Sequence, residues 1–305
     1  MFLYRPFFNL YKKLIDFYET RHVRKMKPFA EIKGWKDVPY IDDGKRDHFL
    51  DIYHPVGEGN GHLILDIHGG SYAFGYKEVN YIFNSYFVAR GFSIVSMNYS
   101  LVKDNVSVYD QIRDVFAALD FLYSNRTKYG LCFDNFAIMG DSAGGHLALM
   151  SDLIFKSEEA RLYYQIDRLP DIEIKRVALN CTVYDFEQVE ELARKIVHRS
   201  ALAVIFSNRY SEPGFLKANN PAQYIKNVMP DPLFISSCHN DFLKKHSFKL
   251  LDDAIRRDIP HRYHFEPTMK LKISHVYNLL FPESLEGKRT NEAMVEFFLL
   301  DERAV

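Results

Sequence analysis

Residues 136–149 read FAIMGDSAGGHLAL, and this stretch decides the fold that the sequence predicts. Its first four residues form an apolar run typical of a buried strand, and the residues after Ser142 favour a helix. The serine is flanked by small residues, which let the backbone turn sharply: Gly140, Ala143 and Gly144. The pattern is that of a nucleophile elbow, a strained turn that exposes a reactive serine at a helix N-terminus. Taken alone, the segment also fits an ordinary helix cap.

A second motif lies upstream, where the apolar run 63–67 leads into HGGS at residues 68–71. A glycine pair after a buried strand lets the backbone approach a ligand closely. A serine nucleophile needs such a loop, because backbone N–H groups must stabilise the negative charge that develops on an attacked carbonyl oxygen. We predict that Gly69, Gly70 and Ala143 donate these N–H groups, and that His68 and Ser71 support the loop.

Together, His68-Gly69-Gly70 and Gly140-Asp141-Ser142-Ala143-Gly144-Gly145 resemble the motifs of the hormone-sensitive-lipase-like carboxylesterase branch of the α/β-hydrolases. The resemblance covers roughly residues 46 to 302 and is specific in the two motifs. One departure is Ser71, where many members have a third glycine. The resemblance implies an α/β-hydrolase fold, with a mainly parallel twisted sheet, helices on both faces and a helical lid or cap insertion. It also implies a catalytic triad in the order nucleophile, acid, base.

Downstream residues complete such a triad. Asp241 follows the strand-like run 232–237, at the end of the strand where open α/β sheets place their sites, so we predict it as the acid. Asp185, one strand earlier, is the alternative acid. His275 lies on the loop after the last predicted strand, and we predict that it is the base. In these roles His275 takes the Ser142 proton and Asp241 orients the imidazole.

From residue 46 onward, strand-like and helical runs alternate, which predicts a mainly parallel sheet covered by helices. We predict strands at 48–53, 62–67, 93–98, 135–139, 176–181, 232–237 and 261–265, and helices at 77–90, 107–127, 143–156, 243–258 and 290–301. Residues 186–229 interrupt this rhythm and predict a lid insertion. We therefore divide the chain into an N-terminal segment, 1–45, and one hydrolase domain, 46–305.

The N-terminal segment is basic and amphipathic. Residues 1–30 carry seven Lys or Arg and two acidic residues, and their apolar side chains are spaced for one face of a helix. Such a helix either caps a pocket or the body of the protein, or contacts a membrane surface. The pattern leaves both interpretations open.

Composition excludes several classes of protein. The 305 residues have a formal charge of −1, which disfavours nucleic acid as a partner. The three widely spaced cysteines, the lack of a cleavable signal peptide and the lack of a long apolar run predict a cytoplasmic protein without a transmembrane span. No spacing of His, Cys or acidic residues resembles a metal site, and no cofactor motif occurs, so we expect neither. The sequence leaves a homodimer open.

The sequence therefore predicts a serine hydrolase that cleaves carboxylic esters of small to medium acyl or aryl groups through an acyl-enzyme on Ser142. We expect Tyr72, Asp141 and Tyr184 to line its pocket. An amide hydrolase of the arylformamidase or peptidase type would use the same triad. A non-catalytic ligand-binding protein on a hydrolase scaffold is an alternative from another class.

Overall fold

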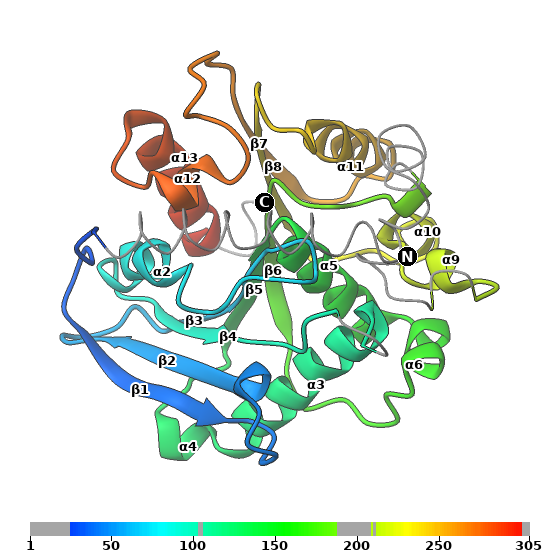
Figure 1. Ribbon diagram of the computed structural model, residues 1–305, viewed down its shortest axis with the longest axis horizontal. Helices are drawn as coiled ribbons and strands as arrows, with labels where there is room; N and C mark the ends of the chain where they lie inside the picture. The colour runs from blue at the N-terminus through cyan, green and yellow to red at the C-terminus, as the bar shows by residue number, and fades with distance from the viewer. Residues whose placement is uncertain (1–24, 103–105, 188–208, 210–211, 301–305) are drawn as a thin grey trace, which may run out of the picture.

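The computed structural model describes residues 25–102, 106–187, 209 and 212–300 (Figure 1). They form one twisted sheet of eight strands in the order β1-β2-β4-β3-β5-β6-β7-β8. Strand β2 is antiparallel to both of its neighbours, and the strands from β4 to β8 are parallel. The strands are β1 Ile32–Pro39, β2 Phe49–Pro55, β3 His62–Ile67, β4 Ser93–Met97, β5 Asn135–Asp141, β6 Ile174–Asn180, β7 Leu233–Cys238 and β8 His261–Glu266.

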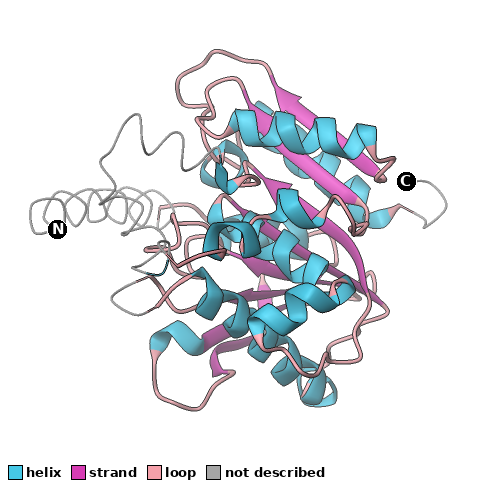
Figure 2. Cartoon of the chain, turned by 90° about the vertical axis from the view of Figure 1, so that its right-hand side faces the viewer, coloured by secondary structure: helices cyan, strands magenta, loops and turns pink. Residues whose placement is uncertain are grey.

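Helices cover both faces of this sheet (Figures 1 and 2). Helices α3, α5, α6 and α11 pack on one face, and α2, α12 and α13 pack on the other. The helices are α2 Tyr81–Val88, α3 Val108–Ser124, α4 Arg126–Tyr129, α5 Ala143–Lys156, α6 Glu158–Tyr164, α9 Phe215–Ala218, α10 Pro221–Tyr224, α11 Lys244–Arg256, α12 Tyr277–Leu280 and α13 Leu285–Leu299, with a 3-10 turn η1 at Arg46–His48.

Side chains along the central strands point alternately to the two faces of the sheet, and this alternation produces the three-layer arrangement. In β3, Leu63, Leu65 and Ile67 face the α5 side, whereas Ile64 faces the α2 side, and all four are buried. Successive strand residues point to opposite faces, so a strand covered on both sides must be apolar at nearly every position. That requirement explains why the central strands were readable from the sequence as continuous apolar runs.

The predicted parallel sheet and its covering helices are confirmed, with one correction at the N-terminal boundary of the sheet. All seven predicted strands and all five predicted helical runs are present, with ends shifted by a few residues. Strand β1, however, lies inside the range that we assigned to the N-terminal segment 1–45, and it pairs with β2. The sheet therefore begins before residue 46. We missed β1 because most of its side chains are exposed on an edge strand, which leaves no apolar run to recognise.

Two predicted features fall partly or wholly outside the described residues. The amphipathic run that begins the chain lies mostly within 1–24, and about half of the lid range 186–229 lies within 188–208 and 210–211. The described end of that range contains α9 and α10, whose Phe215 and Ala222 pack into the core on the α5 side. Among the described residues, no helix is long and apolar enough to cross a membrane.

Candidate active site

Ser142 occupies the turn that the sequence predicts, between β5 and α5. Its backbone has φ 52° and ψ −116°, a strained conformation for a residue with a side chain. Two residues later, the backbone of β3 leaves no room for a side chain at Gly144. A Cβ atom on Gly144 would lie 2.0 Å from the carbonyl oxygen of Ile67. Glycine at 144 therefore lets the elbow pack directly against the end of β3, beside the HGGS loop. The serine lies at the N-terminus of α5, where backbone donors and the helix dipole favour negative charge.

His275 and Asp241 are joined by a hydrogen bond. His275 Nδ1 lies 2.7 Å from Asp241 Oδ1, although the residues come from different loops, after β8 and β7. Ser237 Oγ donates to Asp241 Oδ2 at 2.8 Å, and the Leu243 N–H donates to Oδ1 at 2.9 Å. Burial alone would raise the pKa of Asp241, but the hydrogen bond from His275 and these donors hold that pKa below its ordinary value. The carboxylate therefore stays ionised beside the imidazole.

The alternative acid has another partner. Asp185 is buried and forms an ion pair with Lys249, and it accepts a hydrogen bond from Asn220 Nδ2 at 2.8 Å. The pair with Lys249 helps to hold the pKa of Asp185 below its ordinary value, although burial opposes this. His275 Nδ1 is bonded to Asp241, so the geometry distinguishes the two candidate acids.

The HGGS loop differs from our prediction in one donor. The Gly69 N–H donates to Asp141 Oδ1 at 3.0 Å, so the expectation that it faces a reacting carbonyl is corrected. The carboxylate directly before Ser142 takes this N–H. Gly70 has φ 122°, and a Cβ atom there would lie 1.9 Å from the Phe74 carbonyl oxygen, so only glycine fits this tight loop. Gly70 and Ala143 remain the candidate donors.

His68 contacts the backbone of the HGGS loop, and Ser71 lines the cavity. His68 Nδ1 donates to the Gly69 carbonyl oxygen at 2.6 Å, and its ring stacks on Tyr99 with centroids 4.3 Å apart. Burial lowers the pKa of His68 to about 4, so the ring is neutral at pH 7. Ser71 has φ 49° and lines the same cavity as Ser142. A serine therefore adopts a left-handed conformation at the position where the resemblance predicts a third glycine.

A buried polar network behind this loop was not predicted. Asn80 Nδ2 lies 3.1 Å from both Asp141 Oδ1 and Asp66 Oδ1, and Asp66 also accepts hydrogen bonds from Asn84 and Ser96. Burial raises the pKa of Asp66 to about 7 and also raises that of Asp141. The only sequence signal was an acidic residue inside the apolar run 63–67, which a buried strand rarely contains.

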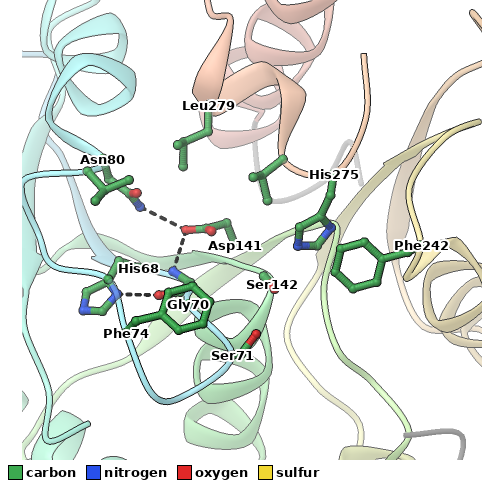
Figure 3. Close-up of a pocket in the computed structure, with 14 residues that line it drawn as sticks. His68, Gly70, Ser71, Phe74, Asn80, Asp141, Ser142, Phe242, His275 and Leu279 are labelled. Carbon is green, nitrogen blue, oxygen red and sulfur yellow. Dashed lines mark hydrogen bonds between the residues drawn. The ribbon is translucent and has the colours of Figure 1, made fainter. Parts of the chain in front are cut away.

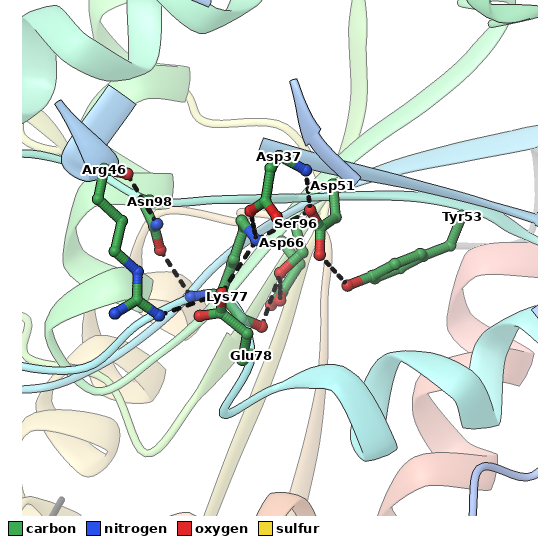
Figure 4. A network of polar contacts seen from close by, with 9 residues as sticks. All are labelled: Asp37, Arg46, Asp51, Tyr53, Asp66, Lys77, Glu78, Ser96 and Asn98. Carbon is green, nitrogen blue, oxygen red and sulfur yellow. Dashed lines mark hydrogen bonds and ion pairs between the residues drawn. The ribbon is translucent and has the colours of Figure 1, made fainter. Parts of the chain in front are cut away.

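The chain after the loop is anchored by Lys77, whose side chain is only 2% exposed (Figure 4). Its Nζ lies 2.8 Å from Asp37 and 2.9 Å from Asp51, which belong to β1 and β2. The Lys77 N–H donates to Asn98 Oδ1 at 2.8 Å. A buried ammonium with several acceptors is costly to disrupt, so this network holds residues 71–80 against the sheet edge.

The two motifs and the His275 loop surround one small cavity of about 90 Å³ (Figure 3). Ser142, His275 and Asp141 line it with the apolar side chains of Phe74, Val79, Phe242, Val276 and Leu279. The Phe242 and His275 ring centroids lie 4.3 Å apart. The cavity thus combines the candidate nucleophile and the candidate base with an apolar wall, as small-molecule sites commonly do.

Two predicted pocket residues do not line this cavity. Tyr184 is fully buried and its hydroxyl donates to Asp253 at 2.7 Å. Tyr72 is also buried, and its ring packs edge to face against His146 at 5.6 Å and Phe186 at 6.3 Å. Both aromatic residues therefore belong to the core. Of the three predicted pocket residues, Asp141 is the one that reaches the cavity.

Cys181, Asp241 and His275 offer three atoms within 4.8 Å of one another that could ligate a metal. Asp241 and His275 already use Oδ1 and Nδ1 for their mutual hydrogen bond. Metal binding through these atoms would break the pair that orients the imidazole, so this geometry favours acid–base chemistry.

The family model BD-FAE matches residues 50–250. The chain belongs to the BD-FAE family. Ser142 and Asp241 lie inside the matched range, whereas His275 lies beyond it.

A curated relative, Esterase LipQ of Mycobacterium tuberculosis, is 27% identical over 203 residues, which cover 65% of this chain and 47% of that protein. Arylesterase of Saccharolobus solfataricus is 25% identical over 180 residues, 57% of this chain and 48% of that protein. This family member thus spans about half the length of these relatives.

Solved structures show the same fold. Esterase B from Lactobacillus rhamnosis matches with a TM-score of 0.85 and 23% identity, over 94% of this chain and 92% of that one. A bacterial heroin esterase matches with a TM-score of 0.71 and 17% identity, over 96% and 90% of the two chains. With the mostly parallel sheet, these likenesses confirm the predicted α/β-hydrolase fold.

Proposed function

We propose that this BD-FAE family member hydrolyses carboxylic esters of small to medium acyl or aryl groups. The 2.7 Å hydrogen bond between His275 and Asp241, beside a cavity that His275 shares with Ser142, carries the proposal. The relatives named above are esterases, and esterase B is inhibited by a tributyrin phosphonate in one structure. A small cavity with an apolar wall suits an ester with a short acyl or aryl group better than a peptide.

In the proposed mechanism, His275 removes the proton from Ser142 Oγ as the oxygen attacks the ester carbonyl. The new C–O bond places negative charge on the carbonyl oxygen, which the Gly70 and Ala143 N–H groups stabilise. His275 then returns the proton to the leaving alcohol, and an acyl-enzyme forms on Ser142. Water, activated by the same imidazole, releases the acid. Asp241 keeps the imidazole in the tautomer that accepts the proton at Nε2 and stabilises its transient positive charge.

A fluorophosphonate probe tests the nucleophile directly. We expect the probe to label the wild-type protein and not Ser142→Ala, and we expect His275→Ala to lose most turnover of p-nitrophenyl esters. Equal labelling of wild type and Ser142→Ala would overturn the assignment. Arylformamides and peptides assayed beside the esters test the amide-hydrolase alternative, which requires amide turnover without ester turnover.

The proposal also covers the binding partners of the protein and its location in the cell. We propose a small-molecule ester as the substrate, with no nucleic-acid partner. Cys132, Cys181 and Cys238 are all free thiols, which supports a reducing compartment such as the cytoplasm. Cell fractionation and size-exclusion chromatography test the location and the homodimer.

A further inference from the structure

The thiol of Cys181 lies beside the His275–Asp241 pair, just after the end of β6. Its Sγ atom, a carboxylate oxygen of Asp241 and a ring nitrogen of His275 all lie within 4.8 Å of one another. The backbone N–H of Val276, the residue directly after His275, donates to Sγ at 3.4 Å. Cys181 is fully buried. One side chain therefore approaches the acid and contacts the loop that carries the base.

The backbone fixes this side chain in place. Cys181 has φ 49°, an uncommon conformation for a residue other than glycine, so the chain turns sharply where the thiol leaves it. Its N–H donates to the Ser236 carbonyl oxygen on β7 at 2.9 Å. The next residue on β7, Ser237, donates to Asp241. The backbone of Cys181 and the carboxylate of Asp241 thus form hydrogen bonds with neighbouring residues of the same strand.

The thiol also keeps its proton. Burial, followed by the charge of Asp241, raises the pKa of Cys181 well above its ordinary value, so the group at pH 7 is S–H. Asp241 accepts hydrogen bonds from His275, Ser237 and Leu243. A carboxylate has about four acceptor positions, so one more weak donor can be accommodated.

On the basis of the proposed function, we propose that Cys181 is a positioning residue for the triad. Its S–H donates to the Asp241 carboxylate while its sulfur accepts the Val276 N–H, so the thiol links the acid to the loop of the base. The link acts on the reaction through Asp241 and His275, and the thiol itself touches no substrate.

Three substitutions separate the hydrogen bonds from simple packing. Cys181→Val keeps an apolar volume without a donor, Cys181→Ala removes the volume as well, and Cys181→Ser restores a donor and an acceptor. We expect the Val and Ala variants to lose about tenfold in kcat with little change in KM, because orientation of the imidazole is lost rather than substrate binding. We expect Cys181→Ser to recover to within about threefold of wild type.

The hydrogen bond from His275 Nδ1 to Asp241 gives a readout that does not depend on turnover. Without the thiol donor, the Asp241 carboxylate has one competing donor fewer, so its hydrogen bond with His275 changes and the Nδ1–H proton resonance of His275 should move. Proton NMR of this imidazole N–H in wild type and Cys181→Val, recorded at one pH, measures the shift.

Cys238→Ala is the matched control, because that buried thiol donates to the Ser274 carbonyl oxygen at 3.2 Å. We expect it to lower the thermal unfolding temperature as Cys181→Ala does, without moving the Nδ1–H proton resonance of His275. An unchanged resonance in Cys181→Val would overturn the proposal, as would equal losses of kcat in the Ser and Val variants. A wild-type protein without ester turnover would instead overturn the proposed function, while the NMR measurement would still test the link.

Discussion

The Gly69 N–H donates to Asp141 Oδ1 across 3.0 Å, although the two residues are 72 positions apart in the chain. This bond joins the HGGS loop to the residue directly before the candidate nucleophile Ser142. Asn80 donates to the same oxygen at 3.1 Å and extends the connection to Asp66. The distance between the candidate donor Gly70 and Ser142 therefore depends on a buried carboxylate as well as on the loop.

Removal of that carboxylate should weaken catalysis without touching the triad. We expect Asp141→Ala to reduce kcat by about 10²-fold, which is the usual cost of misplacing one oxyanion donor. Asp141→Asn keeps an oxygen that can accept the Gly69 N–H, so its loss should be smaller. Steady-state kinetics and the rate of fluorophosphonate labelling measure both variants. Equal losses in the two variants would show that the charge, and not the bond to Gly69, matters.

The two candidate acids should respond differently to neutralisation. Asp241→Asn leaves a group that cannot orient the required imidazole tautomer, so we expect kcat to fall by about 10² to 10⁴-fold. Asp185→Asn breaks an ion pair with Lys249 instead, so it should lower stability more than kcat. Kinetics and thermal unfolding of both variants decide the assignment. A larger kcat loss in Asp185→Asn would make Asp185 the acid.

Leu279 should limit the size of the group that enters the cavity. Its side chain is 2% exposed and lines the wall beside Ser142. We expect Leu279→Ala to raise kcat/KM for octanoyl relative to butyryl p-nitrophenyl esters by at least about tenfold, since room for even one further methylene is worth ~1 to 3 kcal/mol of discrimination.

The matched control is Leu250→Ala in α11, which also removes a buried leucine but lies outside the cavity wall. Both variants should be destabilised by ~2 to 5 kcal/mol. Only Leu279→Ala should change the preference for chain length. The same change in Leu250→Ala would mean that a general loosening of the core sets the preference.

Asp66 should make stability depend on pH near neutrality. Burial raises its pKa in the folded protein to about 7, whereas an unfolded aspartate ionises near pH ~4. Between these values the folded state holds the proton more tightly than the unfolded state, so its contribution to stability is complete below pH ~4 and is lost as the pH rises through about 7.

Urea unfolding at several pH values from 5 to 8 measures this effect. We expect the free energy of unfolding to fall less steeply with pH in Asp66→Asn than in wild type, whatever the difference in absolute stability. Asp152, whose pKa burial raises to about 8, contributes a slope of the same sign to both proteins. Parallel curves for the two proteins would contradict the assignment.

The local parts of the fold and site could be predicted because they depend on short-range rules. A buried parallel strand needs a continuous apolar run, so β3 and β5 were visible, and a strained elbow needs small residues around Ser142. The edge strand β1 has no such requirement, since its side chains are mostly exposed, and it was missed. Tyr184 was expected in the pocket because aromatic residues suit both pockets and cores, and position along the chain does not separate the two.

The sequence by itself determined the α/β-hydrolase fold, the elbow at Ser142 and a short set of candidate acids and bases. Only the tertiary structure decided which carboxylate meets His275, because Asp241 and Asp185 both follow parallel strands and differ only in their neighbours. The tertiary structure also determines that the Gly69 N–H donates to Asp141 and that Cys181 lies beside Asp241. Hydrogen bonds across distant loops depend on distance and direction in three dimensions, and residue types along the chain carry neither.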